Sequence, residues 1–222
     1  MKKLILIHTV GSVYVSFPRQ LQEAANEKIQ IESIVDEFFA NEANRIGKVT
    51  VANKNRFFCL MKAAELADPD IIVVTCSTLS PLIEEIKPYI SKKIIAIDDA
   101  MCKEAAAKYS NILLVATAES AIEPTKHKII SLKDTAKEIK QDIVLIDKAI
   151  ACLKSGDPET HDNIVMERMA EYKNSSYDSI VLCQASLAHL EKPIQELLGI
   201  PVLSTPQRCI NQTISELFTE GR

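Results

Sequence analysis

Cys76 is the residue of this chain whose surroundings best suit chemistry. It lies in the segment VVTCST, where an apolar run gives way to small polar residues. A helical pattern begins near Leu79, so the thiol is expected at the start of a helix, where the helix dipole lowers a thiol's pKa and favours the thiolate. Ser77 and Thr78 can donate hydrogen bonds to it or to a substrate. A thiolate there can act as a base or as a nucleophile.

A second segment repeats this pattern without the thiol. DSIVLCQAS, which begins at Asp178, has the form of DIIVVTCST, which begins at Asp70, but Gln184 occupies the position of Cys76 and Cys183 comes one residue earlier. Adjacent strand residues point to opposite faces, so Cys183 is expected to point into the core and is a doubtful catalytic residue. Gln184 cannot titrate, so it can orient a substrate or stabilise an oxyanion but cannot be a second base.

The repeat extends along the chain with a nearly constant offset. An offset of 108 residues joins Thr9 to Thr117, Asp70 to Asp178, and Cys76 to Gln184. Gly47 and Gly156 come within one residue of the same offset. The later segment IIAIDDA matches IPVLSTP if two residues have been lost. The pattern predicts a duplicated domain.

The elements that must position these residues alternate between short apolar runs and longer helical patterns. We predict strands at Lys2–His8, Ile71–Thr75, Lys93–Ile97, Ile112–Ala116, Ser179–Cys183 and Pro201–Leu203. We predict helices at Phe57–Ala67, Leu79–Tyr89, Asp99–Tyr109, Lys140–Lys154, Glu159–Tyr172 and Leu187–Leu198. Such alternation is typical of parallel sheets with right-handed crossovers, so the predicted fold class is α/β.

The duplication predicts two pseudo-symmetric domains, each a parallel sheet flanked by helices. We expect the first over residues 1–97 and the second over 98–207, with a last helix, about 208–222, packed on the first domain. Ligands of open parallel sheets bind beyond the carboxyl ends of the strands. An active-site cleft is therefore expected between the two domains.

Hydroxyl groups predominate among the side chains at these predicted strand ends. Together with Cys76 and Gln184, the candidates are His8, Thr9, Ser77, Thr78, Asp98, Asp99, Thr117, Ser186, Ser204 and Thr205. Neither Arg nor Lys is among them, and hydroxyls beside helix N-termini suit a small carboxylate. His8 is a weaker candidate because a strand-end histidine is as often structural. His161 is expected to cap or tie a helix start.

Composition excludes several classes of protein. The 222 residues carry a net charge of −4 with 26 basic residues spread along the chain, which gives no footprint for nucleic acid. No apolar run approaches the roughly 20 residues that span a bilayer, and the run at Leu4–Ile7 is too short for a signal peptide. We therefore expect no membrane partner and a cytoplasmic protein. Cys59, Cys102, Cys152 and Cys209 fall in helical patterns and are expected to be buried structural thiols.

Motifs for cofactors and metals are missing from the sequence. None of the five glycines forms GxGxxG or a phosphate-binding loop, and there is no GxSxG elbow. No CxxC or HExxH spacing occurs, so no metal site is predicted. No lysine is marked as a partner for pyridoxal phosphate. We expect neither a cofactor nor a metal.

The motifs together resemble the aspartate/glutamate/hydantoin racemase superfamily over nearly the whole chain. The similarity is carried by LIHTVGSV, VDEFFANEANRIG, VVTCSTLSP, IAIDDAMCKEA, LLVATAES, SGDPETHD, LCQASLAHL and IPVLSTP. The resemblance implies a cofactor-independent enzyme in which one cysteine from each domain faces the substrate α-carbon. One cysteine removes the proton and the other returns it, while hydroxyls and main-chain amides hold the carboxylate. It assigns the first thiol to Cys76 and the second to position 184, which is Gln here.

Three functions stay open at this point. The first is a cofactor-free racemase or isomerase of a small carboxylic acid or amino acid, with Cys76 essential. The second is a decarboxylase or lyase that uses a single thiol. The third is a small-carboxylate binding protein without turnover. Assembly into a homo-oligomer is also left open by the sequence.

Overall fold

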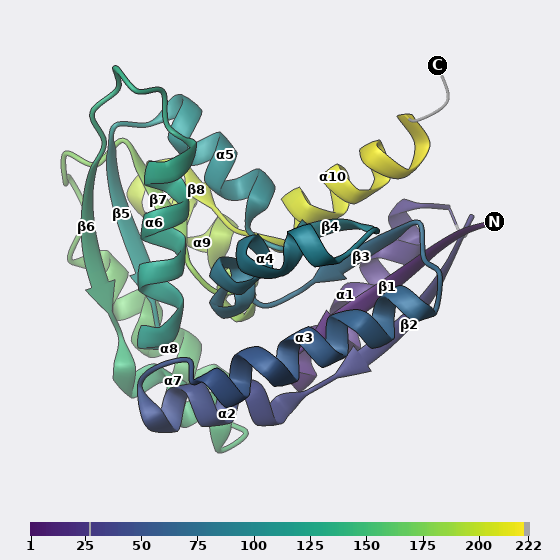
Figure 1. Cartoon of the computed structure of the whole chain (residues 1–222). Helices are drawn as coiled ribbons and strands as arrows, with labels where there is room; N and C mark the ends of the chain where they lie inside the picture. Colours follow the sequence, from purple (N-terminus) through teal and green to yellow (C-terminus); the bar gives the residue numbers. More distant parts are fainter. Residues whose placement is uncertain (27, 220–222) are drawn as a thin grey trace. The chain divides into compact units, whose positions relative to one another are not determined.

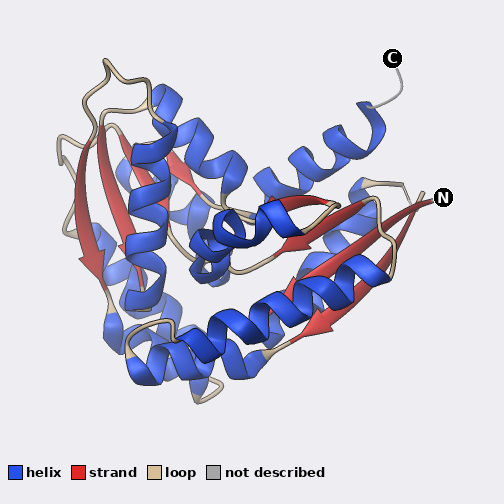
Figure 2. Ribbon diagram, viewed as in Figure 1, coloured by secondary structure: helices blue, strands red, loops and turns tan. Residues whose placement is uncertain are grey.

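The chain forms two compact units in the computed structural model, which describes residues 1–26 and 28–219. The first unit comprises Met1–Ala100 and the chain from Pro206 onward, and the second comprises Met101–Thr205. In each unit, a four-stranded parallel sheet lies among helices (Figures 1 and 2). The predicted α/β fold with two domains is confirmed.

The first unit has the strand order β2-β1-β3-β4. Its strands are β1 (Lys2–His8), β2 (Ile29–Val35), β3 (Ile71–Val74) and β4 (Lys93–Ala96). Its helices are α1 (Gly11–Ala24), α2 (Glu37–Ile46), α3 (Val51–Leu66), α4 (Ser80–Ile86) and α10 (Pro206–Thr219), with 3₁₀ turns η1 (Ser77–Leu79) and η2 (Lys87–Tyr89). The C-terminal helix α10 packs on α1, β3 and β4.

The second unit repeats this topology with the order β6-β5-β7-β8. Its strands are β5 (Asn111–Ala116), β6 (Lys140–Leu145), β7 (Ser179–Leu182) and β8 (Val202–Leu203). Helix α5 (Asp99–Lys108) begins at the boundary, and α6 (Ile122–Leu132), α7 (Asp147–Lys154), α8 (Pro158–Ala170) and α9 (Glu191–Leu198) follow, with 3₁₀ turns η3 (Glu119–Ala121) and η4 (Ala185–Leu190).

An aspartate opens the third strand of each unit in the same way. Asp70 donates its backbone N–H to Lys3 O (2.8 Å), and its carboxylate accepts from Lys3 N (2.8 Å). Asp178 donates to Asn111 O (2.9 Å) and accepts from Asn111 N (3.1 Å). Both aspartates tie the starts of two neighbouring strands together. The repeated Asp of the sequence is therefore structural and lies at the end of the sheet opposite the predicted site.

The strand registers correct one detail of the predicted repeat. Ile72 pairs with Ile94 in the first unit, and Ile180 pairs with Val202 in the second. Both pairs keep the offset of 108 residues, so no residues have been lost between the third and fourth strands of the two copies. The sequence alignment had placed Ile94 against Ile200, which precedes the strand and lies outside its ladder.

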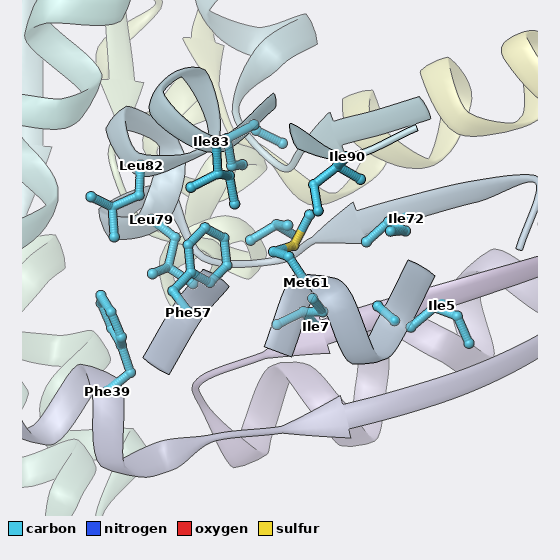
Figure 3. Packing of buried hydrophobic residues seen from close by; sticks show 14 residues of the cluster. Ile5, Ile7, Phe39, Phe57, Met61, Ile72, Leu79, Leu82, Ile83 and Ile90 are labelled. Atoms are coloured by element: carbon cyan, nitrogen blue, oxygen red, sulfur yellow. The ribbon is translucent and has the colours of Figure 1, made fainter. Parts of the chain in front are cut away.

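Equivalent faces of the two sheets carry equivalent helices. In the first unit, Phe57 and Met61 of α3 and residues of α4 pack over Ile7 and Ile72 (Figure 3). In the second unit, α8 and α9 cover the matching face, which includes Val115. The opposite face of the second sheet packs against α5 and α6. Each sheet therefore has its two faces covered, as its continuous apolar strands predict.

Several predicted elements and thiols need correction. Strands β2 and β6 and helices α1, α2 and α6 were not predicted, and Lys140–Lys154 is a strand followed by α7 rather than one helix. β2 and β6 are edge strands with polar, partly exposed residues, so they lack the apolar run of a central strand. Cys102 and Cys209 are buried, but Cys59 is exposed and Cys152 is partly exposed.

Candidate active site

Cys76 lies just beyond the carboxyl end of β3. It follows Ile72 and Val74 on the same face of the sheet and packs at the margin of their core cluster. Its backbone is extended (φ −136°, ψ 113°) and it precedes η1. Cys76 as a whole residue is partly exposed.

The surroundings of Cys76 shift the pKa of its thiol in opposite directions. Burial raises the pKa of the thiol even though part of the residue stays exposed, while the nearby Thr9 hydroxyl and hydrogen bonds from Thr78 and the Leu79 N–H lower it. Burial prevails, so the predicted lowering of the pKa is wrong. The turn η1 also separates Cys76 from α4, which weakens the influence of that helix dipole. Once formed, this thiolate is a stronger base than an exposed one.

Thr9 is the strand-end neighbour of this thiol. Ile7 pairs with Val74, so Thr9 of the β1 end lies beside Cys76 of the β3 end. The Thr9 hydroxyl is buried and makes no hydrogen bond of ordinary geometry, yet it is close enough to favour the thiolate. Of the other predicted anchors in this unit, Ser77 is buried and Thr78 is partly exposed.

His8, the weaker of the predicted substrate ligands, is enclosed by its neighbours in the fold. It is completely buried. Its Nδ1 lies 2.7 Å from Thr75 Oγ1, and its Nε2 lies 3.3 Å from Ser33 Oγ. The Thr75 hydroxyl donates to Ile7 O, so it can only accept from Nδ1–H, which fixes the neutral tautomer. Burial lowers the pKa of His8 to about 4.

Asp98 and Asp99 are also occupied by the fold. The Asp98 carboxylate is fully buried and accepts from Ser80 Oγ at 2.6 Å. The Asp99 carboxylate accepts from Ala96 N at 2.8 Å. These two side chains hold the starts of α4 and α5 against the end of β4. Asp98, a predicted substrate ligand, is therefore already hydrogen-bonded within the fold.

In the second unit, Gln184 occupies the position that corresponds to Cys76. Its Oε1 accepts from Thr117 N (2.7 Å), Ala118 N (2.9 Å) and Thr117 Oγ1 (3.3 Å). Gln184 is partly exposed and Thr117 is buried. Cys183 is fully buried in the opposite face of the sheet, in the core cluster that also contains Cys102. The pleat of β7 thus turns Cys183 into the core and Gln184 toward the strand-end edge.

The remaining candidates of the second unit differ in accessibility. Ser186 is partly exposed in η4, whereas Ser204 is buried and donates to the Glu191 carboxylate at the start of α9. Glu191 was not predicted, although an acidic residue in a first helical turn is a usable signal. His161 is buried and its Nδ1 lies 2.7 Å from Asp162, so it belongs to the start of α8.

Sequence reasoning also missed a guanidinium group near the strand ends of the first unit. Arg56 of α3 donates from Nη2 to Asp36 at 2.9 Å, and Asp36 directly follows β2. The Arg56 guanidinium lies 4.9 Å from the centre of the Phe38 ring. Arg56 lies far from the strand ends in sequence, so only the packing of α3 on the sheet could reveal it.

Neither a metal centre nor a membrane span is found within the described residues. Over residues 1–26 and 28–219, no group of three or more His, Cys, Asp or Glu side chains is arranged to hold a metal ion. Across the same residues, no helix has the length and apolar character needed to cross a membrane.

Comparison with known proteins identifies the family. Residues 8–213 match the model of the Asp/Glu/hydantoin racemase family, so the chain belongs to this family of racemases. A comparison with curated protein sequences finds no match.

Solved structures of racemases share the fold over almost the whole chain. A glutamate racemase from Bacillus anthracis has a TM-score of 0.72 at 16% identity and covers 99% of this chain and 83% of its own. An aspartate racemase from Picrophilus torridus has a TM-score of 0.71 at 14% identity, covering 99% and 94%. An allantoin racemase from Klebsiella pneumoniae has a TM-score of 0.66 at 16% identity, covering 100% and 89%.

Proposed function

We propose that this protein is a cofactor-independent isomerase of the racemase type, with Cys76 as the thiolate base at the α-carbon of a small carboxylic or amino acid. The observation that carries the proposal is the Cys76 thiol itself. Cys76 is a partly exposed residue at the end of a buried parallel strand, and hydrogen bonds from Thr78 and Leu79 favour its thiolate. Donors that stabilise a thiolate are what a proton-abstracting cysteine needs.

The substrate class follows from the family and from the strand ends. Similar structures belong to racemases of glutamate, aspartate and allantoin, so these compounds and their relatives are the first substrates to test. We propose that Thr78 and Ser186, both partly exposed hydroxyls, help to hold the substrate carboxylate. The buried Thr9 acts through the thiol.

A second candidate function is favoured by Gln184. Its amide cannot take or give a proton at the α-carbon, so the second unit lacks a titratable group at the position that matches Cys76. A decarboxylase or lyase needs only one thiol, to protonate the carbanion that forms when a bond to carbon breaks. Small malonates are therefore the matched alternative substrates.

The test is exchange of the α-proton in deuterated water, with glutamate, aspartate, allantoin and malonates supplied separately. General acid–base steps contribute about 10²–10⁴-fold, so Cys76→Ser should lose at least about 100-fold in rate. Cys183→Ala is the control, because Cys183 lies in the core and its loss should leave the rate within a few-fold. The raised pKa of Cys76 also predicts a wild-type rate that still climbs above the ordinary thiol range near 8.5. Equal rates for Cys76→Ser and wild type would exclude the thiolate mechanism.

A further inference from the structure

The orientation of the Gln184 amide is determined by its neighbours. Two backbone N–H groups, those of Thr117 and Ala118, point at one end of the amide at 2.7 and 2.9 Å. A backbone N–H can only donate, so the atom that receives them must be the oxygen and not the nitrogen. The Thr117 hydroxyl adds a third donor at 3.3 Å. The acceptor capacity of Oε1 is thereby filled by the fold.

The NH₂ end of Gln184 is consequently turned away from the end of β5. The residue is partly exposed. Within residues 1–26 and 28–219, no side chain or carbonyl accepts a hydrogen bond from Nε2. A donor fixed in this way needs little further ordering when it binds an acceptor, because its side chain is already held by the oxygen end.

The two units therefore offer different chemistry at equivalent places. The first unit presents a thiol, Cys76, beside the hydroxyl of Thr9. The second presents two N–H donors of Gln184, with Thr117 in the position that matches Thr9. A thiol transfers protons, whereas an amide NH₂ binds oxygen atoms that carry negative charge.

We propose that Gln184 is a specificity-determining residue that donates from Nε2 to an oxygen of the substrate carboxylate, with Thr117 as its positioning residue. The inference rests on the proposed function, because the substrate proposed there is a carboxylic acid whose carboxylate oxygen can accept this hydrogen bond. The site then selects an anionic carboxylate over a neutral amide of the same shape. Glutamate or aspartate should be preferred to a substrate whose α-carboxylate is amidated.

The matched variants are Gln184→Glu and Gln195→Glu. The first keeps an oxygen for the three donors but replaces the NH₂ group with a second carboxylate oxygen. The control is the same substitution in α9, where Gln195 Oε1 also accepts a backbone N–H, that of Val202 at 3.3 Å. Loss of a charge-assisted hydrogen bond should raise KM for glutamate or aspartate by about 10- to 150-fold in Gln184→Glu. Gln195→Glu should leave KM unchanged.

Thr117 variants test the positioning role. Thr117→Val removes the hydroxyl donor and should raise KM less than Gln184→Glu does, while Thr117→Ser should restore the wild-type value. A general structural defect would lower kcat or the melting temperature in both variants. Such a defect would not be expected to disappear in Thr117→Ser, so a wild-type KM in that variant supports the positioning role of the hydroxyl.

A binding measurement separates this inference from the proposed function. In wild-type protein labelled with ¹⁵N, the side-chain NH₂ signals of Gln184, assigned by their loss in Gln184→Glu, should shift when succinate is added. Those of Gln195 should stay in place. Signals of Gln184 that do not move, or a KM in Gln184→Glu that matches Gln195→Glu, would overturn the donor role. If no substrate exchanges its proton, the proposed function fails, and the succinate titration still decides whether Gln184 binds a carboxylate.

Discussion

At the scale of single residues, burial decides which strand-end side chains are free to act. The sequence places a dozen polar groups at the carboxyl ends of the strands, but the fold uses several of them. Asp98 binds Ser80, Ser204 binds Glu191, and His8 is held by Thr75 and Ser33. The residues left with both polarity and exposure are few, and they include two pairs at matching positions, Cys76 with Gln184 and Thr78 with Ser186.

His8 gives a prediction for the pH dependence of stability. Its pKa is about 4 in the folded chain and 6.5 in the reference state, so the unfolded chain takes up the proton first. Stability from neutral His8 is therefore complete above about pH 6.5 and is lost as the pH falls toward 4. Between pH 7 and pH 5 the free energy of unfolding should fall by about 2 kcal/mol through this residue.

Urea unfolding at a series of pH values measures this effect. His8→Gln cannot titrate, so its free energy of unfolding should fall less steeply between pH 7 and pH 5 than that of the wild type. The control is His127→Gln, because the His127 side chain is 78% exposed and its removal should leave the wild-type slope. A His8→Gln slope equal to that of the wild type would mean that another group causes the loss.

At the scale of elements, the helix α3 positions the apolar wall next to Cys76. The helix starts at a capping box, in which Asn53 N donates to Thr50 Oγ1 (3.1 Å) and Thr50 N donates to Asn53 Oδ1 (3.0 Å). The Asn53 amide also donates to Glu42 of α2 at 2.6 Å. This start fixes α3 so that Phe57 packs over the end of the sheet (Figure 3).

Thr50 should therefore contribute to the stability of the first unit. Thr50→Ala removes the oxygen that caps α3 and should cost about 1 kcal/mol in the free energy of unfolding. Thr50→Ser keeps that oxygen and should cost much less. Chemical denaturation of the two variants measures the difference, and an equal loss in both would mean that the methyl group of Thr50, and not its hydroxyl, matters.

The same scale shows what the sequence could and could not predict. The central strands β1, β3, β5 and β7 were predicted closely because both their faces are buried and their sequences are continuously apolar. Edge strands such as β6 were missed because polar residues such as Asp142 interrupt that pattern. At the site, the opposite orientations of the Cys183 and Gln184 side chains could be predicted from the alternation of side chains along a strand. The hydrogen bond from Ala118 N to Gln184 could not be predicted, because a backbone donor is present at almost every residue and no sequence pattern indicates it.

At the scale of the whole molecule, the two units share the same strand arrangement but carry different functional groups at one matching strand end. The two units share a strand order, an aspartate that joins strand starts, and the offset of 108 residues between their third and fourth strands. Cys76 and Gln184 are thus equivalent in register while one is an acid–base group and the other is not. Replacing one by the other is the most direct test of whether both strand ends act on one substrate.

Gln184→Cys restores a thiol to the second unit. The backbone N–H groups of Thr117 and Ala118 lose their acceptor, so substrate binding and the overall rate should fall. If both strand ends act on one α-carbon, the new thiol should return protons to the face that Cys76 does not serve. The ratio of inverted product to incorporated deuterium should then rise above that of wild type. Gln184→Ser, which loses the same amide but gains no acid of suitable pKa, is the control. A ratio in Gln184→Cys equal to that in Gln184→Ser, with the new thiol shown to be free by alkylation, would mean that the second strand end does not reach the reacting carbon.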